Sequence, residues 1–140
     1  MIYGANSLRH KLPYCCYKED SIYYPVWRDF ISGKYVLCIS DEILNEYEEI
    51  IQRKTGSAEV AHSIIVAILN RSNVKHIEVY YHFDLIKSDK DDNKFVDCAI
   101  KANAKFIVSN DRHFNELKNI PFPHVEVIDI NRFLEELKKY

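Results

Sequence analysis

Residues 88–114 read SDKDDNKFVDCAIKANAKFIVSNDRHF, and this stretch decides the fold that we expect. An acid-rich start is followed by apolar residues at helical spacing, which predicts a helix over residues 92–104. A short apolar run at residues 106–108 predicts a buried strand, and this strand runs out directly into polar residues. The stretch therefore places carboxylates at a helix start and beyond a strand end, namely those of Asp92 and Asp111.

The remaining sequence continues the alternation of helices and strands. Apolar spacing, capping residues and glycine stops predict helices over residues 25–34, 40–56, 57–72, 112–120 and 131–140. Compact or alternating apolar runs predict strands over residues 35–40, 76–81, 105–111 and 124–129, with a very short first strand that ends at Gly4. Because strands that alternate with helices favour parallel pairing, we predict an α/β fold with a mainly parallel central sheet. The chain has no repeats and no low-complexity linker, so residues 1–140 are predicted to form a single domain.

The composition is that of an ordinary soluble protein, with 47% hydrophobic and 29% charged residues in 140 positions. No segment approaches the roughly 20 apolar residues that cross a bilayer, and the start does not have the pattern of a secretory signal. We therefore expect a cytoplasmic protein without membrane contact. The net charge of -2 does not favour broad nonspecific binding of nucleic acid, although a local basic groove stays compatible with it.

Four cysteines occur, at positions 15, 16, 38 and 98. They do not form the paired spacing of a zinc site. The preferred interpretation is buried or free thiols in a reducing cytosol, and a redox pair at Cys15 and Cys16 is the alternative.

The aspartates at the start of the stretch have the spacing of a calcium loop, with Asp89, Asp91 and Asn93 as the first ligands. Lys94 stands where such a loop needs glycine, and Ile100 stands where it needs a bidentate glutamate. A calcium loop is therefore not expected.

Two further interpretations exist for these acids. Asp91, Asp92 and Asp111 each precede a predicted helix, where a carboxylate caps the first turn. A phosphatase loop with D-x-D spacing is the weaker alternative, because no clear strand precedes Asp89 and the usual threonine does not follow Asp91. Taken alone, each acid is explained by capping.

The acids are more informative together than separately. Glu46, beside the apolar stripe of the helix predicted at residues 40–56, adds a third segment to Asp92 and Asp111. In α/β folds such residues converge outside the carboxyl ends of the strands. Close carboxylates repel unless a cation neutralises them, and all-oxygen ligands suit Mg²⁺ or Mn²⁺. Metal-dependent phosphodiester cleavage is the chemistry that these acids support.

These segments resemble the PIN-domain family, in particular the branch of toxin components of toxin–antitoxin systems. The matching stretches are LCISDEILNEYEEII, SDKDDNKFVDCAIKANAKFIVSNDRHF and VIDINRFLEEL, so the resemblance covers most of the chain from about residue 26 to residue 137. It implies a three-layer α/β/α sandwich and a ribonuclease that depends on Mg²⁺ or Mn²⁺. Single-stranded RNA, a cognate antitoxin protein and a second copy of the chain are the partners that it implies.

The resemblance also implies roles for individual residues. Glu46, Asp92 and Asp111 correspond to the catalytic, metal-binding acids of the family, and Asp97 is a further possible metal ligand. The supporting residues, which would shape the rim of the site, are Asn6, Ser109 and Asn110. Four basic residues flank the acids and are either phosphate contacts or simple surface charge: Lys87, Lys90, Lys94 and Arg112.

The chain departs from the family pattern at its first strand. That strand normally ends in Asp-Thr-Asn, and here the aligned triplet is Gly4-Ala5-Asn6 on a strand of about three residues. Glycine offers no metal ligand. The alternative function is therefore a catalytically inactive PIN fold that acts as a protein-binding or RNA-binding module.

Overall fold

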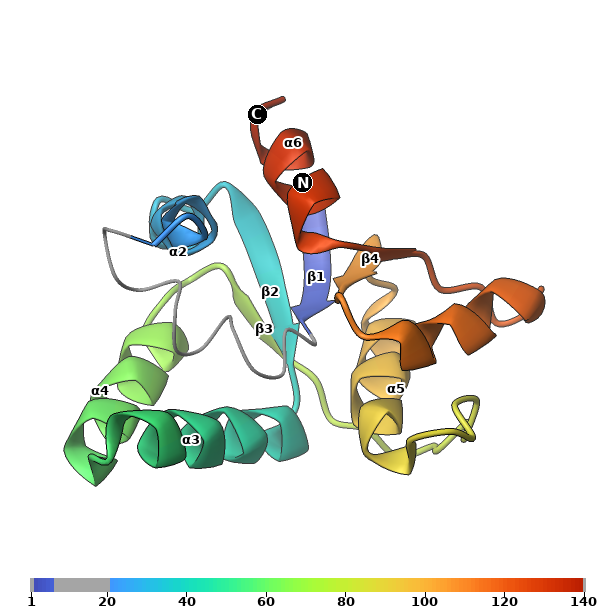
Figure 1. The fold of residues 1–140 in the computed structure, drawn as a ribbon, viewed down its shortest axis with the longest axis horizontal. Coiled ribbons are helices and arrows are strands. Elements are labelled where there is room, and N and C mark those ends of the chain that lie inside the picture. Colours follow the sequence, from blue (N-terminus) through green and yellow to red (C-terminus); the bar gives the residue numbers. More distant parts are fainter. Residues whose placement is uncertain (1, 7–20, 140) are drawn as a thin grey trace.

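Five strands form one parallel sheet with the order β3-β2-β1-β4-β5 (Figure 1). The computed structural model describes the backbone of residues 2–6 and the whole of residues 21–139. Every strand pairing in this part is parallel, which confirms the predicted α/β fold. The strands are β1 (Ile2–Asn6), β2 (Tyr35–Ile39), β3 (Val74–His76), β4 (Phe106–Val108) and β5 (Val127–Ile128).

Four strand predictions are wrong in their bounds by more than one residue. The strands predicted over residues 105–111 and 124–129 are shorter in the structure, at Phe106–Val108 and Val127–Ile128. β1 does not end at Gly4 but continues to Asn6, because β4 pairs with it as far as Val108. The strand predicted over residues 76–81 is instead β3 at residues 74–76. Its partner β2 ends at Ile39, whose carbonyl accepts the last hydrogen bond from Ile77, so the alternating residues that follow find no strand to pair with.

The helices predicted over residues 25–34, 57–72 and 131–140 end earlier in the structure, and the helix predicted over residues 112–120 is a 3₁₀ helix. The caps of α3 and the start of α4 are those that the sequence marks. Ser40 and Ser57 cap α3 and α4 by accepting hydrogen bonds from the amides of Ile43 and Val60, and Gly56 ends α3 with a φ of 68°. The α-helices are α2 (Tyr24–Ile31), α3 (Asp41–Thr55), α4 (Ala58–Leu69), α5 (Asn93–Ala102) and α6 (Ile130–Leu137). Two 3₁₀ helices, η1 (Lys90–Asp92) and η2 (Arg112–Asn119), precede α5 and follow β4.

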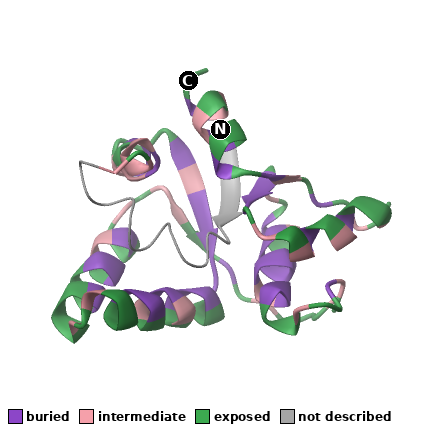
Figure 2. Cartoon of the chain, in the orientation of Figure 1, coloured by how far each residue is buried: buried purple, intermediate pink, exposed green. Residues whose placement is uncertain are grey.

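Helices cover both faces of the sheet, which gives the three layers. α5 packs against β1, β2 and β4, while α2 packs against β2 and α6. The chain passes from β1 through α2 to β2, and it passes from β3 through α5 to β4 in the opposite direction along the sheet. Because such crossovers are right-handed, α2 and α5 lie on opposite faces. The buried residues of Figure 2 lie along the inner sides of these elements.

The carboxyl ends of the strands lie at one edge of the sheet. In Figure 1 the strands run downward, and the first turns of α3 and α5 lie beyond their lower ends. This edge therefore receives Ser40 after β2 and Ser109 after β4, both of which are buried.

Within the described residues, no helix is long and apolar enough to cross a bilayer. The thiols of Cys38 and Cys98 are free and buried. Burial raises the pKa of the Cys98 thiol to about 12, with smaller contributions from Cys38 and Asp97. Cys15 and Cys16, the alternative redox pair, lie outside the described residues.

Candidate metal centre

Four side chains gather at the carboxyl edge of the sheet, and we call them the acidic cluster: Asp89, Asp92, Asp111 and His113. Each offers one ligand atom, and these atoms all lie within 4.8 Å of one another. Two of the residues come from η1 and its cap, and two come from the start of η2. The structure thus brings together two of the three predicted catalytic acids, Asp92 and Asp111.

Local hydrogen bonds fix two of the cluster carboxylates. Asp89 caps η1 by accepting from the amide of Asp91 at 3.1 Å, and Asp111 caps η2 by accepting from the amide of His113 at 2.9 Å. Ser109 in turn accepts from the amide of Asp111 at 2.9 Å. Capping and membership of the cluster are therefore compatible, because a carboxylate has lone pairs for both.

His113 lies at the centre of the cluster. Its Nδ1 is 2.9 Å from Asp111 Oδ1, 3.4 Å from Asp92 Oδ2 and 3.6 Å from Asp89 Oδ2. The Asp92 side chain has no exposed surface. A buried carboxylate beside two others is unfavourable unless positive charge lies among them.

The donor set fits a divalent ion. Three carboxylates suit Mg²⁺ or Mn²⁺, and the imidazole is a donor that first-row transition metals accept readily. The ligand atoms all lie within 4.8 Å of one another, whereas two ligands on opposite sides of one ion at about 2 Å are about 4 Å apart, so binding of one ion would draw these side chains slightly together.

Glu46, the third predicted catalytic acid, is not a member of the cluster. Its Oε1 lies 3.1 Å from Nζ of Lys94, which donates a hydrogen bond to it across the gap between α3 and α5. Both side chains are largely buried, at 12% exposure for Glu46 and 19% for Lys94. The structure thus pairs Glu46 with an ammonium group.

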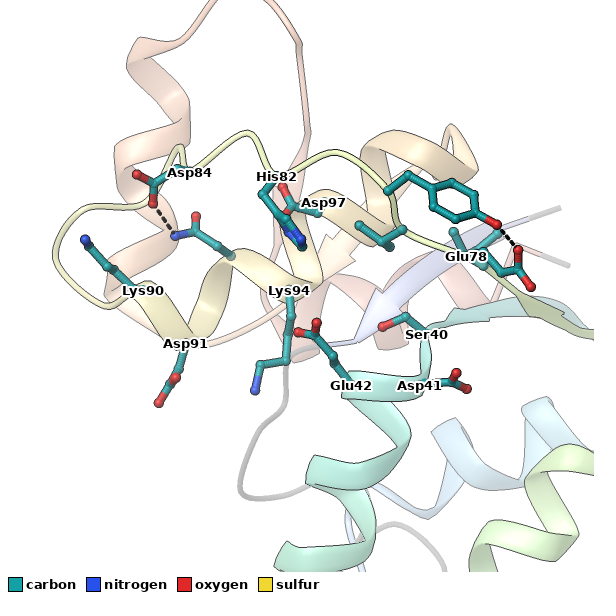
Figure 3. Close-up of a pocket in the computed structure, with 14 residues that line it drawn as sticks. Ser40, Asp41, Glu42, Glu78, His82, Asp84, Lys90, Asp91, Lys94 and Asp97 are labelled. Carbon is teal, nitrogen blue, oxygen red and sulfur yellow. Dashed lines mark hydrogen bonds and ion pairs between the residues drawn. The ribbon is translucent and has the colours of Figure 1, made fainter.

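Asp97, the further predicted metal ligand, also lies outside the cluster. Its Oδ1 accepts a hydrogen bond from the amide of Phe83 at 3.0 Å, and its Oδ2 is 3.2 Å from Nδ1 of His82. Figure 3 shows His82 and Asp97 side by side. The carboxylate fixes the segment that crosses from β3 to α5.

The supporting residues have separate positions. Asn110 accepts a hydrogen bond from the amide of Ile130 at 3.1 Å and so joins the end of β4 to the start of α6. The backbone of Asn6 lies opposite Val108 at the end of β1, and its side chain lies outside the described residues. Gly4 lies two positions earlier in β1, opposite Leu37 and Phe106.

Sequence reasoning missed Asp89 and His113 as members of the site. Asp89 was considered in the calcium-loop and phosphatase interpretations, and in the structure it also caps η1. The sequence carries one signal for His113, which stands two residues after Asp111. In the 3₁₀ helix η2, this spacing brings the His113 side chain next to Asp111, the N-cap residue of η2. Neither signal by itself indicates a ligand.

A groove of about 690 Å³ adjoins the start of α5 (Figure 3). Its walls are the first turn of α3, residues 77–84 and the first turns of η1 and α5. Around this helix start, Asp89 and Asp92 belong to the cluster, whereas Lys90, Asp91 and Lys94 line the groove. The groove and the acidic cluster have no residue in common. Residues 89–94, at the start of α5, nevertheless contribute side chains to both.

The four basic residues that flank the acids differ in their hydrogen bonds and in their exposure. Lys94 donates to Glu46, and Lys87 donates to Asp84 at 3.0 Å. Arg112 and Lys90 are exposed. In the sequence, Lys90 follows Asp89 and Arg112 stands between Asp111 and His113, so both are neighbours of cluster residues.

An α/β fold with acids gathered beyond the carboxyl ends of parallel strands defines a class of divalent-metal proteins to which nucleases belong. A family model described as PIN domain matches residues 12–113, so the chain belongs to the PIN-domain family. PIN domains have a nuclease-type fold and typically depend on divalent metal ions. No curated protein and no solved structure matches the chain. The family match includes Glu46, Asp92 and Asp111 and begins after β1.

Proposed function

We propose that this PIN domain is a metal-dependent endoribonuclease of the toxin–antitoxin type. The observation that carries the proposal is the acidic cluster, in which a wholly buried Asp92 lies within 4.8 Å of two further carboxylates and an imidazole. A chain of this family with such a donor set at the sheet edge has the means to hold Mg²⁺ or Mn²⁺.

In this function Asp92, Asp111, Asp89 and His113 hold the ion. When bound, such an ion activates water and neutralises the charge that develops on a phosphodiester in hydrolysis. The protein's own part is positional, because capping hydrogen bonds fix Asp89 and Asp111 before any ligand arrives. Arg112 and Lys90, exposed sequence neighbours of cluster residues, are the basic residues that we assign to phosphate contacts.

Single-stranded RNA is the substrate class in this proposal, because its unpaired bases and backbone are accessible to a shallow site. A cognate antitoxin protein and a second copy of the chain are the proposed partners, and the resemblance of the three quoted stretches to the toxin branch supports them. A cytoplasmic location is part of the proposal and agrees with the free thiols of Cys38 and Cys98.

The test is cleavage of a mixed-sequence single-stranded RNA by the purified chain with Mn²⁺, Mg²⁺ or EDTA. We expect cutting only with metal and its loss in Asp92→Asn. Asp91→Asn is the matched control, because Asp91 is an exposed neighbour outside the cluster. Cleavage that survives in Asp92→Asn, or that proceeds in EDTA, contradicts the proposal.

Gly4 favours a second candidate function, a PIN fold that binds protein or RNA without cleaving it. The backbone position that the family resemblance assigns to an aspartate is a glycine in the middle of β1. If the wild type binds RNA without cutting it and Gly4→Asp restores both metal binding and cleavage, the binding function is supported. Cleavage by the wild type excludes it.

A further inference from the structure

A second groove, of about 480 Å³, adjoins the acidic cluster, and we call it the η2 groove. Asp111 belongs to both the groove and the cluster. One wall of the groove is η2, and the other is β5 with the start of α6. Its volume lies in the range of about 300 to 1,000 Å³ that is usual for ligand pockets. An occupant of the η2 groove would therefore lie next to an ion held by the cluster.

The 3₁₀ geometry of η2, the orange helix after β4 in Figure 1, sorts its side chains into three rows. With three residues per turn, positions i and i+3 lie one above the other. Phe114 and Leu117 form a buried row, at 1% and 3% exposure. In the second row, His113 joins the acidic cluster and Glu116 accepts two backbone hydrogen bonds. The third row is therefore the one that η2 can offer to a ligand.

The third row consists of Arg112, Asn115 and Lys118, which are exposed and line the η2 groove. Because a 3₁₀ turn rises about 6 Å, the two basic residues stand about 12 Å apart along the helix, with an amide between them. Within residues 21–139, neither basic side chain has a hydrogen-bond or ion-pair partner. The row thus offers two separate positive charges that lead away from the metal centre.

The opposite wall adds hydrogen-bonding groups. Asn131 lines it, and its amide is both a donor and an acceptor. Asn110 accepts from the amide of Ile130 through Oδ1, which leaves its NH₂ group as a donor. Such amides suit the edges of unpaired bases.

The groove of Figure 3 has the opposite charge balance. Its lining includes six carboxylates and two lysines, and one of these lysines, Lys94, donates to Glu46. Phosphates of a nucleic acid are attracted by basic side chains and repelled by carboxylates. Of the two grooves, the η2 groove is therefore the one that suits a polyanion.

We propose that the η2 groove is the subsite that holds single-stranded RNA on one side of the scissile phosphate. Arg112 and Lys118 contact two phosphates of the strand, and the amides of Asn115 and Asn131 hydrogen-bond to the nucleoside between them. The inference rests on the proposed function for its ligand. It adds the direction in which the substrate extends from the metal centre.

The test measures binding of a short fluorescein-labelled single-stranded RNA of mixed sequence by fluorescence anisotropy, in EDTA to prevent cleavage. Asn115→Asp should weaken binding at least about fivefold, as expected for like charges about 4 Å apart in water. Asn119→Asp is the matched control, because it adds the same charge to another row of η2, outside the groove, and it should weaken binding less than about twofold. Equal losses in the two variants contradict the inference.

Salt dependence gives a second measurement. In Lys118→Met, the slope of log affinity against log salt concentration should become shallower by about 0.7, which corresponds to one phosphate contact on a single strand. Lys54→Met removes an exposed lysine from the last turn of α3 and should leave the slope unchanged. Equal slopes in the two variants overturn the assignment of Lys118.

Asn131→Asp tests the opposite wall independently of η2. A carboxylate in the first turn of α6 favours that helix, so the melting temperature should not fall. The RNA affinity should nevertheless fall at least about fivefold. A stable variant with wild-type affinity contradicts the inference, even where an η2 variant does not fold.

The outcomes separate the inference from the proposed function. If the wild type cuts RNA with Mn²⁺ while Asn115→Asp and Asn131→Asp bind RNA as the wild type does, the inference fails and the nuclease function stands. If the wild type binds RNA with the expected losses in these variants but does not cut it, the nuclease function fails and the η2 groove stands as an RNA-binding site. A wild type that binds no RNA overturns the inference.

Discussion

Asp92 and Asp97 stand five positions apart at the start of the same helix and are almost equally inaccessible, at 0% and 2% exposure. Their surroundings are opposite. Asp97 accepts a hydrogen bond from the Phe83 amide and meets one partly exposed histidine. Asp92 lies among two further carboxylates and the His113 imidazole.

This comparison separates two uses of a buried carboxylate. Main-chain donors satisfy a carboxylate and make it part of the scaffold. Neighbouring carboxylates make the charged form of a buried carboxylate unfavourable, and a bound cation relieves this repulsion. Burial alone therefore does not identify a metal ligand, whereas the chemistry of its neighbours does.

The largest expected effect is the stabilisation of the fold by a bound divalent ion, and it tests whether Asp92 is a ligand of that ion. Mn²⁺ at about one hundred times its Kd should raise the free energy of unfolding of the wild type by about 2.7 kcal/mol. Asp92→Asn should lose most of this gain, and Asp97→Asn should keep it. Thermal melting with and without Mn²⁺ measures both, and equal losses in the two variants would remove the distinction.

The next effect concerns stability without metal. Asp97→Ala leaves the amide of Phe83 without its acceptor, so the free energy of unfolding should fall by about 2 kcal/mol. Asp92→Asn should leave it unchanged or raise it, because one of three close carboxylates is neutralised. Urea denaturation in EDTA gives both values. A larger loss in Asp92→Asn than in Asp97→Ala would reverse the comparison.

His113 lies beside Asp92 and His82 lies beside Asp97, so the two histidines should differ in their effect on metal binding as these two acids do. His113→Ala removes a donor from the cluster and should weaken Mn²⁺ binding at least about tenfold, the loss that removing a partner of a metal ligand already causes. His82→Ala should leave binding unchanged, since Asp97 is the one acid that His82 contacts within residues 21–139. Calorimetric titration compares them, and equal affinities would exclude His113 from the site.

The smallest effect is on the Cys98 thiol next to Asp97. Because burial raises its pKa to about 12, almost none of it is thiolate at pH 8, and iodoacetamide should scarcely modify the folded chain at this position. Asp97→Ala releases the crossing segment and should speed the modification, while Asp92→Asn should not. Mass spectrometry of the peptide that contains Cys98 follows the rate. Equal rates in the two variants would show that Asp97 does not hold this region closed.

Elements with complete local signals were predictable from the sequence. α3 has a serine cap, acids in its first turn and a glycine stop, so its bounds follow from residues within the helix and its caps. The strand predicted at residues 76–81 failed because strand length depends on a partner. β2 ends at Ile39, and no residue within the predicted strand carries that information.

The candidate site was predictable only in part, for a similar reason. Asp92 and Asp111 follow from motif positions, and in the structure β4 ends at Val108, three residues before Asp111. The pairing of Glu46 with Lys94 joins positions 48 residues apart, and it depends on how α3 approaches α5. The position of His113 depends on a 3₁₀ turn instead of an α-helical one.

β1 comes first along the chain among the described strands, yet it occupies the middle of the sheet. It pairs with β2 soon after, but its pairing of Gly4 with Phe106 must wait until most of the chain has been synthesised. Such distant pairings slow folding, because a long loop must close before the contact forms. During translation, the β1 edge that later receives β4 therefore stays open until residues 106–108 have been synthesised.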